Sequence, residues 1–321
     1  MKIKYSLIVS RSVVISLIVS AFVFVFTILI MPLYSRGDAQ VYKKVYDALP
    51  EMNLSEGFLF YARNLTSREY VHFILSWVAS RFIVRDLFIA FFNALLAYVS
   101  IQLFQKWKIS RFIAALLVST NFYFLVLYFA AERLKFGFIF LALSFLYCEK
   151  IKRFFGFATL ALFSHVQVII IYVSILFNFL VKKILRLSGT GKISKKVIAY
   201  FPFILVPILL VGGQIASKFQ SYYGRGGIGA TYKILLFLFL ALCYSKKKRE
   251  TLLIFIPLVI AAFLVGGNRV NMLGYFVFLY YGAQFKRGWN IGVVTTSIYF
   301  AYSSIIFLVN VIQHGNGFFS G

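Results

Sequence analysis

The chain has 321 residues, of which 61% are hydrophobic and 20% aromatic, and it carries a formal net charge of +25. A soluble domain contains about 45–50% apolar residues, so this composition excludes an ordinary water-soluble globule. Stretches of about twenty apolar residues recur along the chain, which is the pattern of a polytopic helical membrane protein. We therefore expect an all-α bundle, one integral membrane domain over residues 1–321, with about 10–12 transmembrane helices.

The basic residues fall mainly in short clusters between the apolar stretches, as the positive-inside rule expects for cytoplasmic turns. This distribution indicates that the basic residues face a lipid bilayer, and it argues against binding to nucleic acid. It also predicts that the N-terminus is cytoplasmic. The predicted cytoplasmic clusters are Lys2 to Arg11, Lys106 to Arg111, Lys150 to Arg153, Lys182 to Lys196, Lys246 to Arg249, and Lys286 with Arg287.

The predicted spans are 12–33, 86–105, 112–130, 134–149, 154–180, 197–216, 232–245, 251–267, 270–285 and 290–312. The stretch 154–180 is ambiguous, because one crossing would place the lysine-rich segment after it on the outside. Two half-length helices that turn near Ser164 and His165 would return the chain, for about eleven crossings. Half-helices at membrane depth need cover from protein or a wet cavity. We favour this return, which predicts that His165 faces polar groups.

Two long connections are predicted outside the membrane, at 34–85 and 216–233. Near the end of the first, apolar residues recur with helical spacing at Tyr70, Phe73, Ile74, Trp77 and Val78. This helix is too short to cross the hydrocarbon core. We expect it to lie at the outer interface as a short amphipathic helix.

Three arginines are candidates for binding an anionic ligand on the external face. Arg133 and Arg269 each open a predicted helix whose N-terminus faces outward, and Arg225 lies in the glycine-rich second loop. A helix N-terminus carries partial positive charge and free N–H groups, and a guanidinium adds a bidentate fork that suits phosphate. The simpler alternative is that Arg133 pairs with the adjacent Glu132, or that these arginines reach lipid phosphates.

His165 lies within an apolar stretch, where an imidazole is costly and is by default a functional candidate. Asp38, Tyr42 and Tyr46 recur every four residues and share one face of a predicted helix. They form either an ordinary amphipathic helix or a surface on which the tyrosines bind glycan while Asp38 serves as base or acceptor. With nine Asp and Glu in all, a carboxylate metal cage is hard to build, so no metal or other cofactor is expected.

The order of motifs resembles the EpsG-type branch of the Wzy bacterial polysaccharide (O-antigen) polymerases. The segments that carry the resemblance are "RGDAQVYKKVY", "REYVHFILSWVASRF", "ERLKFGFIFLALSF", "LFSHVQVIIIY" and "GNRVNMLGYFVF". Where the family often has Arg-Gln after the third span, this chain has Arg133-Leu134-Lys135. The resemblance implies an inner-membrane enzyme that joins repeat units carried on undecaprenyl diphosphate, at the periplasmic face, beside a chain-length regulator and a flippase.

On this interpretation the three arginines hold the diphosphate without a metal ion, and a base accepts the proton of the attacking hydroxyl. The residues leave Asp38, Glu69 and His165 open as that base, and His165 could instead bind phosphate. Two other classes remain open from sequence. One is a flippase or transporter for the same lipid, and the other is a membrane transferase such as an O-antigen ligase or acyltransferase.

Overall fold

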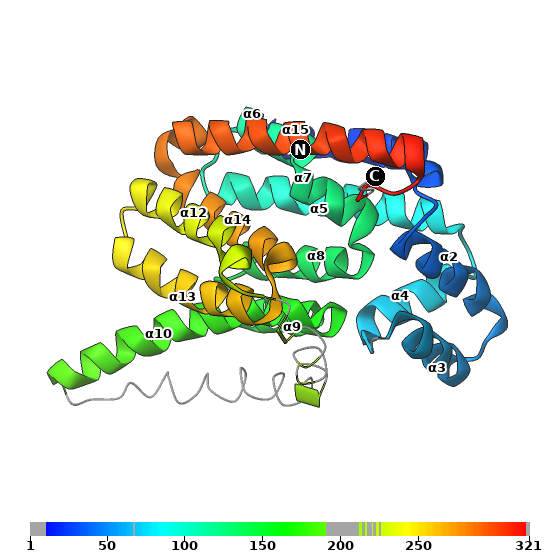
Figure 1. Ribbon diagram of the computed structural model, residues 1–321, viewed down its shortest axis with the longest axis horizontal. Helices are drawn as coiled ribbons and strands as arrows, with labels where there is room; N and C mark the ends of the chain where they lie inside the picture. Colours follow the sequence, from blue (N-terminus) through cyan, green and yellow to red (C-terminus); the bar gives the residue numbers. More distant parts are fainter. Residues whose placement is uncertain are drawn as a thin grey trace, which may run out of the picture.

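A computed structural model of the chain describes residues 11–66, 68–190 and 226–318, together with residues 212, 213, 216, 220, 223 and 224. Within these residues every regular element is a helix (Figure 1). The first part contains α1 (Arg11–Ile30), α2 (Asp38–Ala48), α3 (Leu54–Leu65) and α4 (Tyr70–Ala79). The middle contains α5 (Arg85–Lys106), α6 (Arg111–Thr120), α7 (Phe122–Leu125), α8 (Glu132–Leu146), α9 (Ile151–Ser164) and α10 (Ile169–Thr190). The last part contains α12 (Ile228–Tyr244), α13 (Lys248–Val265), α14 (Gly267–Gly282) and α15 (Ile291–His314).

The helices pack in layers around α5 and α8. Helix α1 packs on α5, α5 on α8, and α8 on α9, while α12, α13 and α14 form a second group that reaches α10 through α13. In Figure 1, α6 and α15 cover one side of this stack, and α9 and α10 lie on the other. Helices α2–α4 form a separate small group at one end of the bundle.

The apolar character expected from composition is carried by the long helices. Four segments of the described chain are long and apolar enough to cross a membrane, at 12–33, 85–106, 166–184 and 285–314. A fifth is obtained if the bent pair 111–120 and 122–130 counts as one span. This supports a membrane protein but is fewer than the predicted number of spans. One reason is length, since the 17 residues of α12 extend only about 26 Å.

The predicted straight span 112–130 is instead bent by 52°. The bend lies at Asn121, whose backbone is extended and whose Oδ1 accepts from the N–H of Tyr123 at 3.0 Å. Its Nδ2 donates to the hydroxyl of Tyr275 at 3.0 Å. A π-helical turn, Val126–Ala130, follows before α8 begins. A polar side chain that inserts into the helical ladder is a recognised cause of such a kink.

The chain reverses at His165, as the favoured interpretation of 154–180 predicts. The second helix is not half-length, however, because α10 has 22 residues and 166–184 is long and apolar enough to cross a membrane. His165 has extended backbone angles, φ −159° and ψ 117°, between α9 and the short turn that leads into α10. At the far end of α10, Lys182 pairs with Glu250 at the start of α13. Helix α9 starts near that same end, because Lys106 pairs with Glu149 just before it and the residues around both pairs line one cavity. Thus α9 approaches the end at which α4 lies, and α10 leads away from it.

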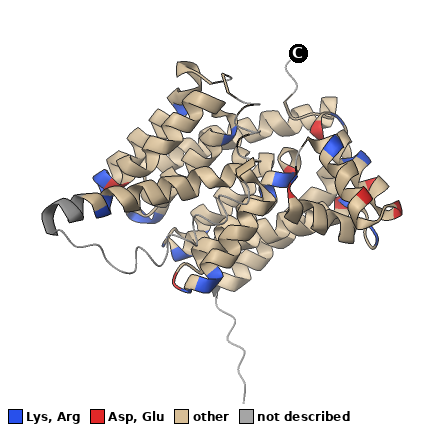
Figure 2. Ribbon diagram, turned by 90° about the horizontal axis from the view of Figure 1, so that it is seen from below, with Lys and Arg blue, Asp and Glu red and all other residues tan. Residues whose placement is uncertain are grey.

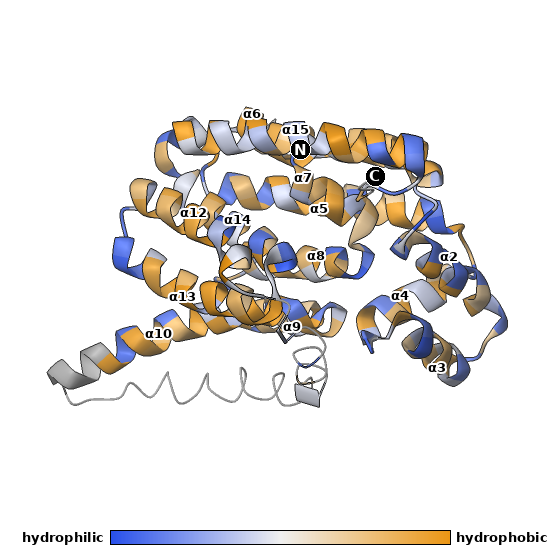
Figure 3. Cartoon of the chain, viewed as in Figure 1, coloured by the Kyte–Doolittle hydropathy of each residue, from blue (hydrophilic) through white to orange (hydrophobic). Residues whose placement is uncertain are grey.

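The first predicted external connection, 34–85, folds into three helices: the two predicted ones, which are α2 and α4, and α3 between them, which was not predicted. Figure 3 shows hydrophilic residues concentrated there and hydrophobic residues along the long helices, and Figure 2 shows most of the acidic residues in the same region. The predicted apolar stripe of α4 is divided. Phe73 is buried, whereas Ile74 and Val78 are exposed. The buried face of α4 also carries His72 and Ser76.

Candidate active site at the helix ends

Three ionisable residues from distant parts of the sequence meet where α4 and α8 begin and α9 ends. Glu69 Oε2 lies 2.8 Å from Nη1 of Arg133, and Glu69 Oε1 lies 2.5 Å from Nδ1 of His165. We call Glu69, Arg133 and His165 the open triad. The simpler alternative, a local pair between Arg133 and Glu132, is not formed, because each residue pairs with a different partner.

Local backbone features position each member of the open triad. Glu69 precedes α4 with an extended backbone, and Arg133 is the second residue of α8. His165 fits against α8 because position 137 is glycine. A Cβ at Gly137 would lie 2.8 Å from Cγ2 of Val168 and 3.1 Å from Cβ of His165. A side chain at that position would push the His165 turn away from α8.

Glu69 is ionised although it is almost completely buried, with 1% of its surface exposed. Burial alone would raise the pKa of Glu69, but the adjacent His165 and Arg133 outweigh it and hold that pKa well below its ordinary value. An ionised carboxylate only accepts hydrogen bonds, so Nδ1 of His165 carries the proton that faces Glu69. This contact fixes the imidazole ring and directs Nε2 toward the far side.

The contacts continue from His165 to Arg269 through Gln167. Nε2 of His165 lies 3.1 Å from Oε1 of Gln167, and Nη1 of Arg269 donates to the same oxygen at 3.3 Å. Gln167 and Arg269 line a cavity of about 390 Å³, together with Lys233 and the first residues of α14. Arg133 and Arg269, which are 136 positions apart, are therefore joined by one chain of contacts at one end of the molecule. Arg133 is at its buried end and Arg269 at its open end.

Glycines allow the N-terminus of α14 to form a wall of this cavity. Gly266 has φ +94° and ends α13, and Gly267 begins α14 against α12. A Cβ at Gly267 would lie only 2.4 Å from the carbonyl oxygen of Ala230. The start of α14 thus presents its partial positive charge beside Arg269 and Lys233. A cavity with these groups is suited to an anion such as phosphate.

A second cluster of the same residue types lies behind the first. Glu132 Oε2 lies 2.6 Å from Nη2 of Arg85, and Glu132 Oε1 lies 3.4 Å from Nε2 of His72. The hydroxyl of Tyr61 lies 2.9 Å from Nδ1 of His72. All four side chains are buried. We call Glu132, Arg85 and His72 the closed triad, because Tyr61 covers the end at which the open triad has Gln167.

The predicted glycan-binding tyrosines are both buried, at 7% exposed for Tyr42 and 4% for Tyr46. Tyr42 accepts a hydrogen bond from Nε of Arg133 at 2.8 Å, so it belongs beside the open triad. Tyr46 donates to the carbonyl of Ile83 at 3.0 Å and packs on Phe88. Neither ring offers a free face for a sugar. Their shared helical face was predicted correctly, but it is directed into the protein.

The other predicted site residues differ in position. Asp38 begins α2, is exposed, and forms no hydrogen bond or ion pair with the part of the chain that the structure describes. It is therefore not brought together with Glu69 and His165. Arg225 lies outside the described residues.

Sequence reasoning missed the residues that complete these clusters. His72 is not among the candidates selected from sequence, because it lies on the helix expected at the interface, and Gln167 has no charge to mark it. One signal for the closed triad was present. Arg85 and Glu132 are each the first residue of a helix, and the selected Arg133 and Arg269 also lie within the first three residues of theirs.

Comparison of the chain with protein-family models, curated proteins and solved structures finds no match. Its function must therefore be inferred from its own residues and their geometry.

Proposed function

We propose that the protein is a glycosyltransferase of the inner membrane that polymerises oligosaccharide repeat units carried on undecaprenyl diphosphate. The product would be O-antigen or a similar surface polysaccharide, made at the periplasmic face, on which the open triad would lie. The observation that carries this proposal is the chain of contacts from Arg133 through Glu69, His165 and Gln167 to Arg269, because it links a buried carboxylate–imidazole pair to a cationic cavity. The resemblance to the Wzy polymerases supports the same substrate class.

The cavity beside α14 would hold the diphosphate of the donor. Arg269, Lys233 and the N–H groups that open α14 supply positive charge there without a metal ion. A phosphate oxygen that replaced Oε1 of Gln167 would accept from Nη1 of Arg269, while Nε2 of His165 beside it stays unprotonated and available to the acceptor hydroxyl. Charge that develops on the leaving diphosphate as the glycosidic C–O bond breaks is stabilised by these donors.

His165 would serve as the base, with Glu69 as its orienting partner. The terminal hydroxyl of the acceptor repeat attacks the anomeric carbon of the donor sugar, its O–H proton passes to Nε2 of His165, and the sugar–diphosphate bond breaks. Glu69 stabilises the imidazolium that forms, and Arg133 keeps Glu69 ionised and in place. The products are a chain longer by one repeat and undecaprenyl diphosphate. A chain-length regulator and a flippase are the expected protein partners.

Reconstitution tests this proposal against the flippase alternative. Purified full-length protein in liposomes is given radiolabelled lipid-linked repeat units, and the glycans are separated by size. We expect a ladder of multiples of the repeat. Transfer of labelled lipid between leaflets without elongation would instead identify a flippase, and transfer of a single glycan to another acceptor would identify a ligase.

A further inference from the structure

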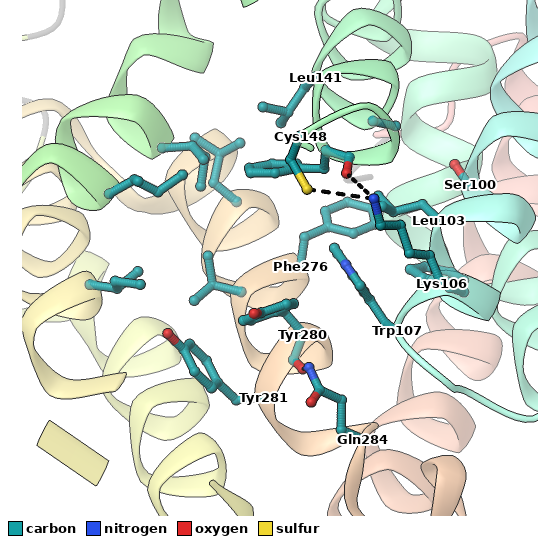
Figure 4. A pocket seen from close by; sticks show the side chains of 18 of the residues that line it. Ser100, Leu103, Lys106, Trp107, Leu141, Cys148, Phe276, Tyr280, Tyr281 and Gln284 are labelled. Atoms are coloured by element: carbon teal, nitrogen blue, oxygen red, sulfur yellow. Dashed lines mark hydrogen bonds between the residues drawn. The ribbon is translucent and has the colours of Figure 1, made fainter. Parts of the chain in front are cut away.

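A second cavity, of about 550 Å³, lies at the opposite end of the bundle from the open triad. Helices α5, α8, α10, α13 and α14 supply its walls (Figure 4). Neither triad contributes a residue to it. Its chemistry is therefore independent of the proposed catalytic site.

The cavity has an apolar interior and a polar mouth. The interior is formed by residues such as Phe138, Leu141, Ile171, Leu273 and Phe276. The polar and aromatic residues toward the mouth are Lys106, Trp107, Lys108, Asn178, Glu250, Tyr280, Tyr281 and Gln284. The carboxylate of Glu250 is already paired with Lys182. Lysine together with Trp and Tyr is the combination found where a membrane protein meets the head-group layer. The interior would then lie at hydrocarbon depth.

The length of the interior suits a hydrocarbon chain. Along α8 the lining extends from Phe145 near the mouth to Phe138, seven positions away, which is about 10 Å of helix. Phe138 lies next to Gly137, against which the His165 turn packs. The cavity therefore ends in the layer of side chains that supports the open triad.

Two polar groups at the mouth lack a strong partner in the described chain. Asn178 is only 8% exposed, and its Oδ1 accepts no hydrogen bond. Lys108 is exposed and forms no ion pair with a described residue, whereas Lys106 pairs with Glu149 and donates to the carbonyl of Leu146. A buried acceptor without a partner is costly, and a ligand whose polar end carries a hydroxyl donor, such as a glycerol head group, would relieve that cost at Asn178 Oδ1.

We propose that this cavity binds one acyl chain of an anionic phospholipid from the adjacent leaflet, with the lipid head group at Lys108 and Asn178. Apolar pockets with a few polar groups at one end are the usual form of lipid-like ligand sites, and basic pockets between membrane helices bind anionic head groups. The site requires that the bundle lies in a membrane, but not that it makes polysaccharide.

Native mass spectrometry of the full-length protein tests the site. Delipidated protein in detergent is titrated with phosphatidylglycerol or with phosphatidylcholine of the same acyl chains. We expect the first phosphatidylglycerol to bind several-fold more tightly than phosphatidylcholine. Ala142→Trp, which fills the cavity wall, should remove that first binding event, whereas Leu116→Trp on the exposed face of α6 should not.

Lys108→Glu provides the second arm, because it changes an exposed residue and leaves the interior intact. It should reduce the preference for phosphatidylglycerol to about that for phosphatidylcholine, as expected when one attractive head-group contact is reversed. Equal binding of both lipids by the native protein, or a preference unchanged in Lys108→Glu, would overturn the head-group assignment. Tight first binding in folded Ala142→Trp would overturn the acyl-chain site.

Discussion

The open and closed triads contain the same three residue types, one Glu, one Arg and one His. They differ in the group that the histidine contacts on the side away from the glutamate. In the open triad, His165 leads through Gln167 to Arg269 and a cavity. In the closed triad, His72 ends at the hydroxyl of the buried Tyr61. The comparison teaches that buried charge alone does not identify a catalytic site, because what matters is whether the charge can reach a ligand.

The two triads are also linked through the start of α8. Glu132 and Arg133 are adjacent at the start of α8 and pair in opposite directions, one with Arg85 and the other with Glu69. The closed triad therefore fixes the helix start from which Arg133 extends. We infer that the closed triad serves stability and that the open triad serves chemistry.

The largest effect is expected from Arg269→Ala. This arginine is only partly buried and donates to Gln167, so its loss should leave the fold intact. Removal of one charge-stabilising donor lowers turnover by about 10²–10³-fold. Glycan elongation by reconstituted protein measures the effect, with exposed Arg63→Ala as the matched control. Arg269→Lys should recover only part of the activity, because ammonium cannot make a bidentate contact.

Arg133→Ala is less informative than Arg269→Ala, because it leaves buried Glu69 without its cationic partner. A loss of polymer in that variant could result from misfolding. The protein level of Arg133→Ala, measured beside its glycan profile, tests how firmly the fold depends on this pair.

A substitution in the closed triad should lower the stability of the protein. Arg85→Ala leaves Glu132 buried and ionised, which typically costs about 3–5 kcal/mol. We expect a marked fall in the denaturation midpoint in detergent, while the fraction that remains folded keeps its specific activity. A fully stable but inactive Arg85→Ala protein would assign chemistry to the closed triad and remove the distinction between the two.

Glu69 predicts a pH dependence that distinguishes the open triad. Its folded-state pKa lies below the unfolded value of about 4.3. Its stabilisation is therefore complete above that unfolded value and is lost as pH falls through the folded pKa. The stability difference between native protein and Glu69→Gln should be constant from pH 6 to 8 and shrink below about pH 4. Glu51→Gln, at an exposed position, is measured in parallel as the matched control.

Tyr61→Phe is expected to have a smaller effect. It removes one buried hydrogen bond to His72, worth about 0.5–1.5 kcal/mol of unfolding free energy. Thermal unfolding in detergent measures the loss. Because Tyr61 closes the second triad rather than meeting substrate, glycan elongation should be unchanged. A large activity defect with normal stability would place Tyr61 in the reaction.

The smallest expected effect is that of a chelator. If guanidinium groups and the α14 terminus hold the diphosphate, EDTA should leave the rate of elongation unchanged. Recovery of activity by added Mg²⁺ after EDTA treatment would show that a divalent ion contributes to the site.

Local features were the ones that could be predicted from sequence. The span 86–105 matches α5 closely, the helices opened by Arg133 and Arg269 are present, and the chain turns at His165. Each depends on hydropathy, charge or helix-end chemistry within a short window. The bend at Asn121 was missed because it depends on a hydrogen bond to Tyr275, 154 positions away.

The partners within the site could not be predicted. Glu69 pairs with His165 across 96 positions, and no periodicity in the chain encodes that contact. Tyr42 and Tyr46 also show that sequence does not predict tertiary partners. Their common face was evident, but hydropathy alone does not say whether an aromatic face is covered by protein or open to a ligand.

The most direct test is glycan elongation by Arg269→Ala and Arg85→Ala compared in the same liposomes and normalised to folded protein. The account predicts that Arg269→Ala yields only single repeat units, whereas folded Arg85→Ala yields the native ladder. A native ladder from Arg269→Ala would contradict it.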